Sequence, residues 1–123
     1  MEFSKQAAIY LQIGDHVCEN ILMKKWKEGD KIPSVRDMAA TIEVNPNTVM
    51  RAYSYLQERG IVYNQRGIGY FVSENAYENT MILKKNDFMD NDLPQLFRKI
   101  DLLDLDFTYI VKLYEEYSKK NTE

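Results

Sequence analysis

Apolar side chains recur at helical spacing in two short stretches between residues 34 and 60. The first stretch begins at Ser34, whose hydroxyl can accept the backbone N–H of Asp37, and it ends at Glu43. Its apolar residues are spaced i, i+3, i+4 and i+7, which places one stripe along one face: Val35, Met38, Ala39 and Ile42. The pattern predicts a short amphipathic helix.

The second stretch repeats this pattern and carries clear signals at both ends. Asn45 is a good N-cap, and Pro46 suits the first helical position because its missing N–H is not needed there. Gly60 can take the left-handed conformation that closes a helix. The apolar stripe between these ends consists of Val49, Ala52, Tyr53 and Leu56. Two such helices joined by a short turn predict a helix-turn-helix.

Hydrogen-bonding side chains remain on the second helix once its apolar stripe is set aside. They are Asn45, Asn47, Thr48 and Arg51, and Met50 is the one apolar exception. Such groups match base edges and phosphates, and the second helix of many DNA-binding helix-turn-helix proteins lies with its N-terminal residues in the major groove. An ordinary solvated helix face would carry similar residues, so the helical pair alone leaves both interpretations open.

The flanking residues predict a core helix before this pair and a hairpin after it. Residues 4 to 27 repeat an apolar residue every four positions, which indicates one long helix with Ser4 as its cap. Residues 61–63 and 68–72 are β-rich runs around a polar tip at residues 64–67, and they predict a β-hairpin. A hairpin directly after the second helix of such a pair is the wing of a winged helix.

Three arginines fall on successive predicted elements. Arg36 lies near the start of the first short helix, Arg51 lies on the second, and Arg66 stands beside Gly67 at the hairpin tip. An arginine on a tip of this kind can enter the narrow, negatively charged minor groove of DNA. The three form one basic surface if the fold brings them together, and they are ordinary solvated arginines if it does not.

Residues 74 to 123 predict a second, helical unit. A weakly signalled helix over residues 81–89 is followed by apolar residues at helical spacing from Leu93 to Leu103. Pro94 is tolerated only in a first turn, which predicts a break or a kink near residues 90–92. Asp106 caps a last helix with the apolar stripe Phe107, Ile110, Val111, Tyr114 and Tyr117. Two or three helices cannot bury their apolar faces alone. The helices could pack on the winged domain of their own chain, but pairing with a second copy of the chain is the better explanation.

Composition and charge narrow the class of protein. The chain has 123 residues and no apolar run long enough to span a membrane, and its first residues show no secretory signal. The net charge of −3 comes from residues 76–123, where seven Lys and Arg face ten Asp and Glu, while residues 1–75 hold nine of each. Any affinity for phosphate therefore requires local clustering of basic residues.

Candidate catalytic and metal-binding groups are scarce. His16 and the single cysteine, Cys18, are two positions apart on a helix, so they project from different faces and do not form a nucleophile–base pair or a metal site. We expect Cys18 to be core and His16 to be surface. We therefore predict no catalytic residue, no cofactor and no metal, and a protein that is not an enzyme. A single cysteine cannot form an internal disulfide, which fits a cytoplasmic protein.

Five segments between residues 9 and 72 occur together in a known order and spacing. They are IYLQI at 9–13, GDKIPSVR at 29–36, VNPNTV at 44–49, RAY at 51–53 and RGIG at 66–69. Together these segments, which span about half of the chain, resemble the N-terminal domain of GntR-type bacterial transcription regulators. The Asn-Pro-Asn-Thr-Val run and the short C-terminal region resemble the YtrA subfamily.

The resemblance implies a mainly α fold with a small β wing. It divides the chain into a winged helix-turn-helix at 1–73 and a short helical dimerisation region at 74–123. By position, it implies contacts to DNA from Arg36, Asn45, Asn47, Thr48, Arg51 and Gly67; Arg66 joins this set because of its place at the hairpin tip.

We therefore predict a homodimeric, sequence-specific transcription regulator of the repressor type. It would bind double-stranded DNA at a palindromic operator, with the recognition helix in the major groove and the wing at the minor groove. The alternative is a winged-helix module that binds protein and not DNA. An unidentified small-molecule effector could bind at the dimer interface beside Tyr109, Tyr114 and Tyr117, although such aromatic stripes are more often core.

Overall fold

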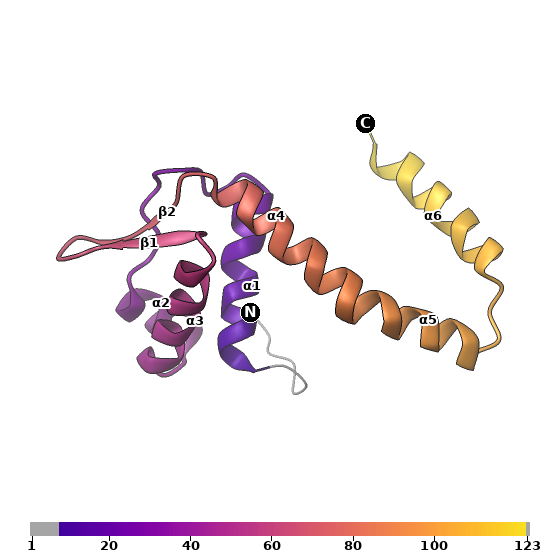
Figure 1. The fold of residues 1–123 in the computed structure, drawn as a ribbon, viewed down its shortest axis with the longest axis horizontal. Helices are drawn as coiled ribbons and strands as arrows, with labels where there is room; N and C mark the ends of the chain where they lie inside the picture. The colour runs from indigo at the N-terminus through magenta and orange to yellow at the C-terminus, as the bar shows by residue number, and fades with distance from the viewer. Residues whose placement is uncertain (1–7, 123) are drawn as a thin grey trace. The chain divides into compact units, whose positions relative to one another are not determined.

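Three helices precede a two-stranded hairpin in the computed structural model, which describes residues 8–122 (Figure 1). The helices are α1 (Ile9–Leu22), α2 (Val35–Ile42) and α3 (Pro46–Glu58), and the strands are β1 (Val62–Gln65) and β2 (Gly69–Val72). This order confirms the winged helix-turn-helix. The Ser4 cap that the sequence predicts lies outside the described residues.

The first helix is shorter than the sequence predicts. The expected end at residue 27 is wrong, because α1 stops at Leu22. Lys24 takes a left-handed φ of 60° and donates its backbone N–H to the Ile21 carbonyl at 3.0 Å, and the Lys25 N–H donates to the Asn20 carbonyl at 2.9 Å. This pair of bonds is the Schellman arrangement, which usually contains glycine. A lysine in its place gave no sequence signal for the end of the helix.

The two short helices begin and end as predicted. Ser34 Oγ accepts the Asp37 N–H at 3.0 Å, and Asn45 Oδ1 accepts the Asn47 N–H at 2.8 Å. Gly60 has a φ of 72°, and the Ile61 N–H donates to the Leu56 carbonyl at 3.0 Å to close α3. These caps satisfy backbone groups that the helix itself leaves without partners.

The core of the first unit gathers the apolar stripes of all three helices. Tyr53, at its centre, is fully buried, donates its hydroxyl to the Pro33 carbonyl at 2.7 Å and packs edge-on against Tyr70 at 4.9 Å between ring centroids. Burial, with a smaller effect from Tyr70, raises the pKa of Tyr53 far above its usual range. Cys18 is buried, as predicted, and His16 is half-buried against Trp26. The fully or nearly buried residues shared with the predicted stripes are Ile13, Val17, Ile21, Met38, Ala39, Val49, Ala52, Tyr53 and Leu56.

The wing pairs antiparallel from Val62↔Val72 to Gln65↔Gly69. Its tip is therefore residues 66–68; the prediction of a tip starting at Asn64 is wrong, because Asn64 and Gln65 pair within β1. The segment before α2 also pairs with β2, since the Gly29 N–H donates to the Val72 carbonyl at 2.9 Å and the Ile32 N–H to the Tyr70 carbonyl at 3.0 Å. These bonds tie the wing to the chain that leads into α2.

The start of α4 (Ala76–Asp87) packs with the winged helix. Ala76 and Thr80 are buried, and Lys84 Nζ lies 2.6 Å from Asp15 Oδ1 of α1. The Asn79 side-chain amide donates to the Gly60 carbonyl at 2.9 Å. The first compact unit consequently runs to Lys84, and Lys85 begins the second.

The second unit contains a π-helical turn and two helices with few buried side chains. The turn η1 (Phe88–Asp92) leads into α5 (Leu93–Leu102), and α6 (Phe107–Asn121) follows. The turn lies where Pro94 predicts a break, because Pro94 has no N–H to donate to a residue in the preceding turn. Asp106 caps α6 as predicted, accepting the Thr108 N–H at 2.9 Å.

Large apolar side chains of this unit remain exposed. Leu102 is 79% exposed and Tyr114 is 66% exposed, and Ile100 is the one buried apolar residue among residues 85–122. The predicted stripes of α5 and α6 are thus present, and the unit itself does not cover them. Across residues 8–122, no helix combines the length and apolar character needed to cross a membrane.

Candidate nucleic-acid interface

The N-terminal turns of α3 share a hollow with the start of α1. Three of the predicted contact residues, Asn47, Thr48 and Arg51, line it together with Ala8, Ile9 and Tyr10, and its volume is about 380 Å³. The tight turn after Glu43, which has a φ of 57°, and the Asn45 cap set where α3 begins. The hollow therefore presents the N-terminal end of α3 together with the first residues of α1.

Arg51 is held by an aromatic ring from α1. Its guanidinium carbon lies 3.9 Å from the centroid of the Tyr10 ring, and Tyr10 in turn meets Tyr55 edge-on at 6.0 Å. Stacking uses the flat face of a guanidinium and leaves its in-plane N–H donors available. Among the described residues, Arg51 has no hydrogen bond or ion pair, so these donors are free for a ligand.

The remaining polar residues of the α3 N-terminus differ in which hydrogen-bonding groups they can offer to a ligand. Asn45 uses its side-chain oxygen for the cap, which leaves its amide NH₂ group to contact a partner. Asn47 is exposed and Thr48 is half-buried, and both lie in the first turn, where backbone N–H groups favour an anion. This turn is chemically suited to a phosphate or to base edges.

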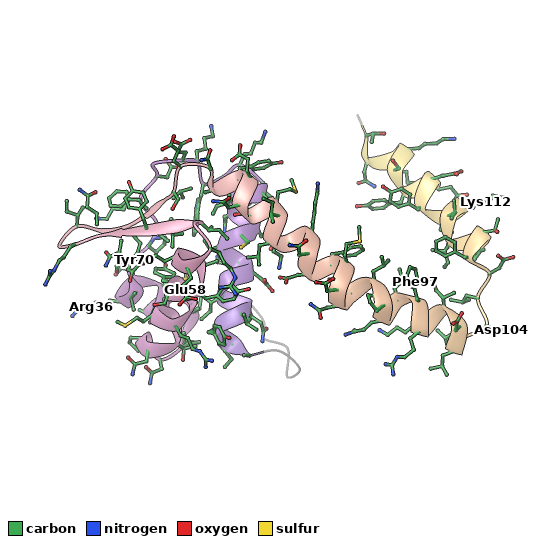
Figure 2. The ribbon with its side chains drawn as sticks, in the orientation of Figure 1. Arg36, Glu58, Tyr70, Phe97, Asp104 and Lys112 are labelled. Carbon is green, nitrogen blue, oxygen red and sulfur yellow. The ribbon has the colours of Figure 1, made fainter. Side chains whose placement is uncertain are left out.

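Arg36, Arg66 and Gly67 lie outside this hollow. Arg36 is in the first turn of α2, where its exposed side chain points away from α1 and α3 (Figure 2). Arg66 and Gly67 form the exposed tip of the wing, and Gly67 has a φ of 78°. Neither arginine pairs with an acidic residue within residues 8–122. Both therefore keep their charge available at the surface.

Sequence reasoning missed Tyr10. It stands in the apolar pattern of the first helix and looks like a flanking core residue. Its contact with Arg51 joins residues that are far apart in the chain, so no local pattern could have predicted it. The contact between the half-buried Tyr10 and the exposed Arg51 exists only because α1 packs against α3 in the folded protein.

The outward face of α3 is polar apart from one side chain. Met50 is 50% exposed and is the only large apolar residue of α3, Pro46–Glu58, that is exposed. A face of this kind does not offer the contiguous apolar patch that typically marks a protein-binding surface.

Residues 9–72 match the family model for bacterial regulatory proteins of the gntR family. This range is more than half of the 123 residues. The chain belongs to the GntR family. Over 88 residues it is 43% identical to the HTH-type transcriptional repressor YtrA of Bacillus subtilis, a match that covers 72% of this chain and 67% of YtrA. The matches span 62% and 67% of the lengths of the first two curated relatives.

Solved structures of GntR-family proteins share the fold. A GntR-family transcriptional regulator from Bacteroides thetaiotaomicron is 40% identical, with a TM-score of 0.73 over 94% of this chain and 100% of that chain. The DNA-binding domain of AraR, solved in complex with the operator ORR3, is 26% identical, with a TM-score of 0.54 over 59% of this chain and 86% of that domain.

Membership in the GntR family confirms three predictions. The chain has the winged-helix fold, its sequence is similar to that of YtrA, and its relatives are named transcriptional regulators and not enzymes. GntR-family regulators bind DNA, so a winged-helix module without DNA binding is not favoured.

Proposed function

We propose that this GntR-family protein is a homodimeric repressor that binds a palindromic operator in double-stranded DNA. The observation that carries the proposal is the set of donors at the N-terminal end of α3, where Arg51 is stacked on Tyr10 and no residue among 8–122 uses its N–H groups. A second helix with such donors at its N-terminal end suits the major groove.

The contacts divide by element. Asn47, Thr48 and Arg51 of α3 face the base edges, and the Asn45 amide and the backbone of the first turn approach a phosphate. Arg36 of α2 adds a contact to phosphate or guanine. Arg66 and Gly67 at the wing tip lie in the minor groove, where an arginine meets enhanced negative potential.

Dimerisation is assigned to residues 74–123, and DNA binding to residues 1–73. The exposed apolar side chains of α5 and α6 support this assignment, because a soluble unit rarely leaves so many uncovered; they include Leu96, Phe97, Leu102, Leu103, Phe107 and Tyr114. A second copy presents the same face, and a two-fold dimer matches a palindromic site. An effector beside Tyr109, Tyr114 and Tyr117 at that interface stays a prediction.

The relatives support a repressor role, and the DNA target supports a cytoplasmic location. YtrA, at 43% identity, is named a transcriptional repressor. A protein that binds bacterial operator DNA acts in the cytoplasm, where that DNA lies.

The test is fluorescence-anisotropy titration of the full chain against the palindrome upstream of its own gene, with a scrambled duplex alongside, at two salt concentrations. We expect tight, salt-sensitive binding to the palindrome with two protomers per site. Arg51→Ala should lose about 1–3 kcal/mol of specific binding, because a base contact is removed.

Arg59→Ala is the matched control for Arg51. Arg59 also stacks on a tyrosine, with its guanidinium carbon 3.7 Å from the Tyr55 centroid, but it lies at the other end of α3. The Arg59→Ala substitution removes one positive charge, as Arg51→Ala does, but at a position away from the proposed DNA contact. Equal losses of DNA affinity in the two variants would mean that Arg51 contributes only its positive charge and no base contact. Weak binding of the parent to both duplexes at low salt would reject the proposal.

Sedimentation velocity tests the dimer separately. Phe97→Lys in α5 and Tyr114→Lys in α6 each place a charge on an exposed apolar face and should shift the protein toward monomer. Lys112→Ala, at an exposed polar position of α6, should leave the dimer unchanged. A monomeric parent at micromolar concentration would contradict the assignment of residues 74–123.

A further inference from the structure

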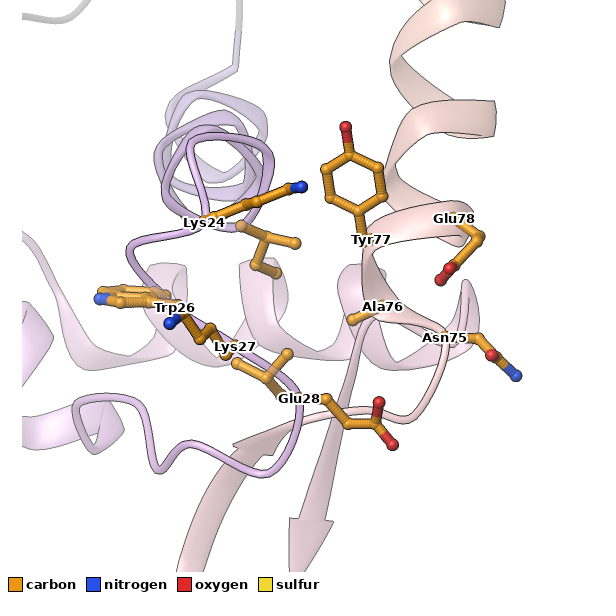
Figure 3. Close-up of a pocket in the computed structure, with 10 residues that line it drawn as sticks. Lys24, Trp26, Lys27, Glu28, Asn75, Ala76, Tyr77 and Glu78 are labelled. Carbon is orange, nitrogen blue, oxygen red and sulfur yellow. The ribbon is translucent and has the colours of Figure 1, made fainter.

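A second hollow of the first unit lies where α1 ends and α4 begins, away from the α3 N-terminus. Its volume is about 310 Å³, which is at the small end of the range of small-molecule sites. Figure 3 shows Lys24, Trp26 and Lys27, from the chain after α1, along one side, and Ala76, Tyr77 and Glu78 of α4 along the other. The DNA-contact residues proposed above do not line it.

The interior of this hollow is apolar and aromatic. Ile21 and Ala76 are each 2% exposed and Val72 is 1% exposed, so the floor is made of core side chains. Trp26 is half-buried and Tyr77 is 37% exposed, and both rings line the walls. An apolar floor with two aromatic walls suits the body of a small organic molecule.

The charged groups at the rim favour an anion. Lys24 lies with its ammonium 5.3 Å from the Tyr77 ring centroid, and Lys27 follows beside Trp26. The first turn of α4 also lies here. The Ala76 N–H donates to the Ser73 carbonyl at 3.1 Å, and the N–H groups of Tyr77 and Glu78 have no acceptor within their own helix. Both features attract negative charge.

Two glutamates at the same rim lower the positive potential that a negatively charged ligand would meet. Glu78 lies in the first turn of α4, where the helix dipole partly offsets its charge. Glu28 is therefore the residue that mainly cancels the positive charge of the two lysines. The residual positive potential is small. A monoanion fits this balance better than a multiply charged phosphate, and better than a cation.

We propose that this hollow is a binding site for a small organic monoanion, a carboxylate attached to an apolar or aromatic body. The carboxylate lies at Lys24, on the Tyr77 side of the hollow, Lys27 adds positive charge on the Trp26 side, and the body lies on the apolar floor between Trp26 and Tyr77. A ligand here joins the end of α1 to the first turn of α4 and stabilises that junction by mass action. This ligand site is separate from the proposed DNA contacts, and the experiment that tests it does not require DNA binding.

Trp26 reports on the site directly because it is the only tryptophan in the chain. We would titrate the full chain with 3-phenylpropionate, L-phenylalanine and phenethylamine, which share a phenyl body and differ in charge, and follow tryptophan fluorescence. We expect a saturable change with 3-phenylpropionate that weakens with salt, and about tenfold weaker binding of phenethylamine, roughly the effect of one favourable charge contact.

Three lysine variants separate the site from general charge effects. Lys24→Met and Lys27→Met should each weaken 3-phenylpropionate binding by roughly two- to fivefold, as expected for exposed charge pairs. Lys25→Met is the matched control, since Lys25 is exposed in the same segment but does not line the hollow, and it should bind like the parent. Thermal melts confirm that all three remain folded.

Several results would overturn the proposal. They are the absence of a saturable change with all three probes, equal or tighter binding of phenethylamine or L-phenylalanine, and a loss in Lys25→Met as large as in Lys24→Met. Each result can be obtained without DNA, so failure of this site is distinguishable from failure of the proposed operator binding.

Discussion

The guanidinium carbon of Arg51 lies 3.9 Å from the centroid of the Tyr10 ring, so α1 supports a side chain of α3 that is proposed to contact DNA. An arginine in solution samples many rotamers, and ordering it on binding costs free energy. Stacking on Tyr10 limits that freedom before DNA arrives. The first helix therefore serves the interface as well as the core.

Tyr10→Leu should weaken specific DNA binding about two- to fivefold, because the loss of a partly exposed cation–π contact is worth roughly 0.5–1 kcal/mol. Tyr10→Phe keeps the ring face and should bind like the parent. Anisotropy titration measures both. The decisive control is the Arg51→Ala background, where Tyr10→Leu should have no further effect if it acts through Arg51.

Tyr53→Phe should lower the free energy of unfolding by about 1 kcal/mol, because the Pro33 carbonyl loses the hydroxyl that lies 2.7 Å away. Urea unfolding measures the change. Burial raises the pKa of Tyr53 in the folded state, so this residue contributes its stability in full below its ordinary pKa of 10.0. Above that pH the unfolded chain ionises first, and the advantage of the parent over Tyr53→Phe should shrink. A gap that widens with pH would contradict the burial argument.

Gly14→Ala and Gly60→Ala should have opposite effects on stability. A Cβ at Gly14 would meet side-chain atoms of Leu56 and Tyr55 at 3.7 and 3.8 Å, which are ordinary contacts, and alanine in a helix interior should gain about 0.5–1 kcal/mol. At Gly60 the φ is +72° and a Cβ would lie 2.8 Å from Asn79 Nδ2, so alanine should lose roughly 1–2 kcal/mol. Thermal denaturation of the two variants side by side provides the comparison, and equal signs would refute it.

Thr80→Val should stabilise the first unit by roughly 1 kcal/mol. Thr80 is fully buried, and its hydroxyl has no hydrogen-bond partner within residues 8–122. Valine has nearly the same shape and removes the unsatisfied polar group. Thr41→Val, at an exposed position of α2, is the control and should change stability by less than about 0.5 kcal/mol. A destabilised Thr80→Val variant, measured by urea unfolding, would indicate that the hydroxyl is satisfied in solution.

Local signals predicted most of the winged helix. Ser34, Asn45 and Gly60 mark helix ends through bonds to residues only two to five positions away, so the relevant chemistry is visible in the sequence. The stripe of α3 is buried as predicted because helical spacing places those residues on one face whatever surrounds them. The same reasoning located the irregular turn before Pro94, which is π-helical and interrupts the α-helical pattern without ending the helix, and the Asp106 cap.

The sequence by itself therefore determined the helix-turn-helix, the hairpin and the polar residues at the start of α3. Only the tertiary structure decided that Tyr10 supports Arg51 and that α4 packs on Gly60 through Asn79. The physical reason is separation along the chain. Caps and stripes depend on neighbouring residues, whereas a ring beneath an arginine and an amide bonded to a distant glycine depend on which elements meet in space. The end of α1 at Leu22 is also local, but a lysine in the left-handed position gives no sequence signal for it.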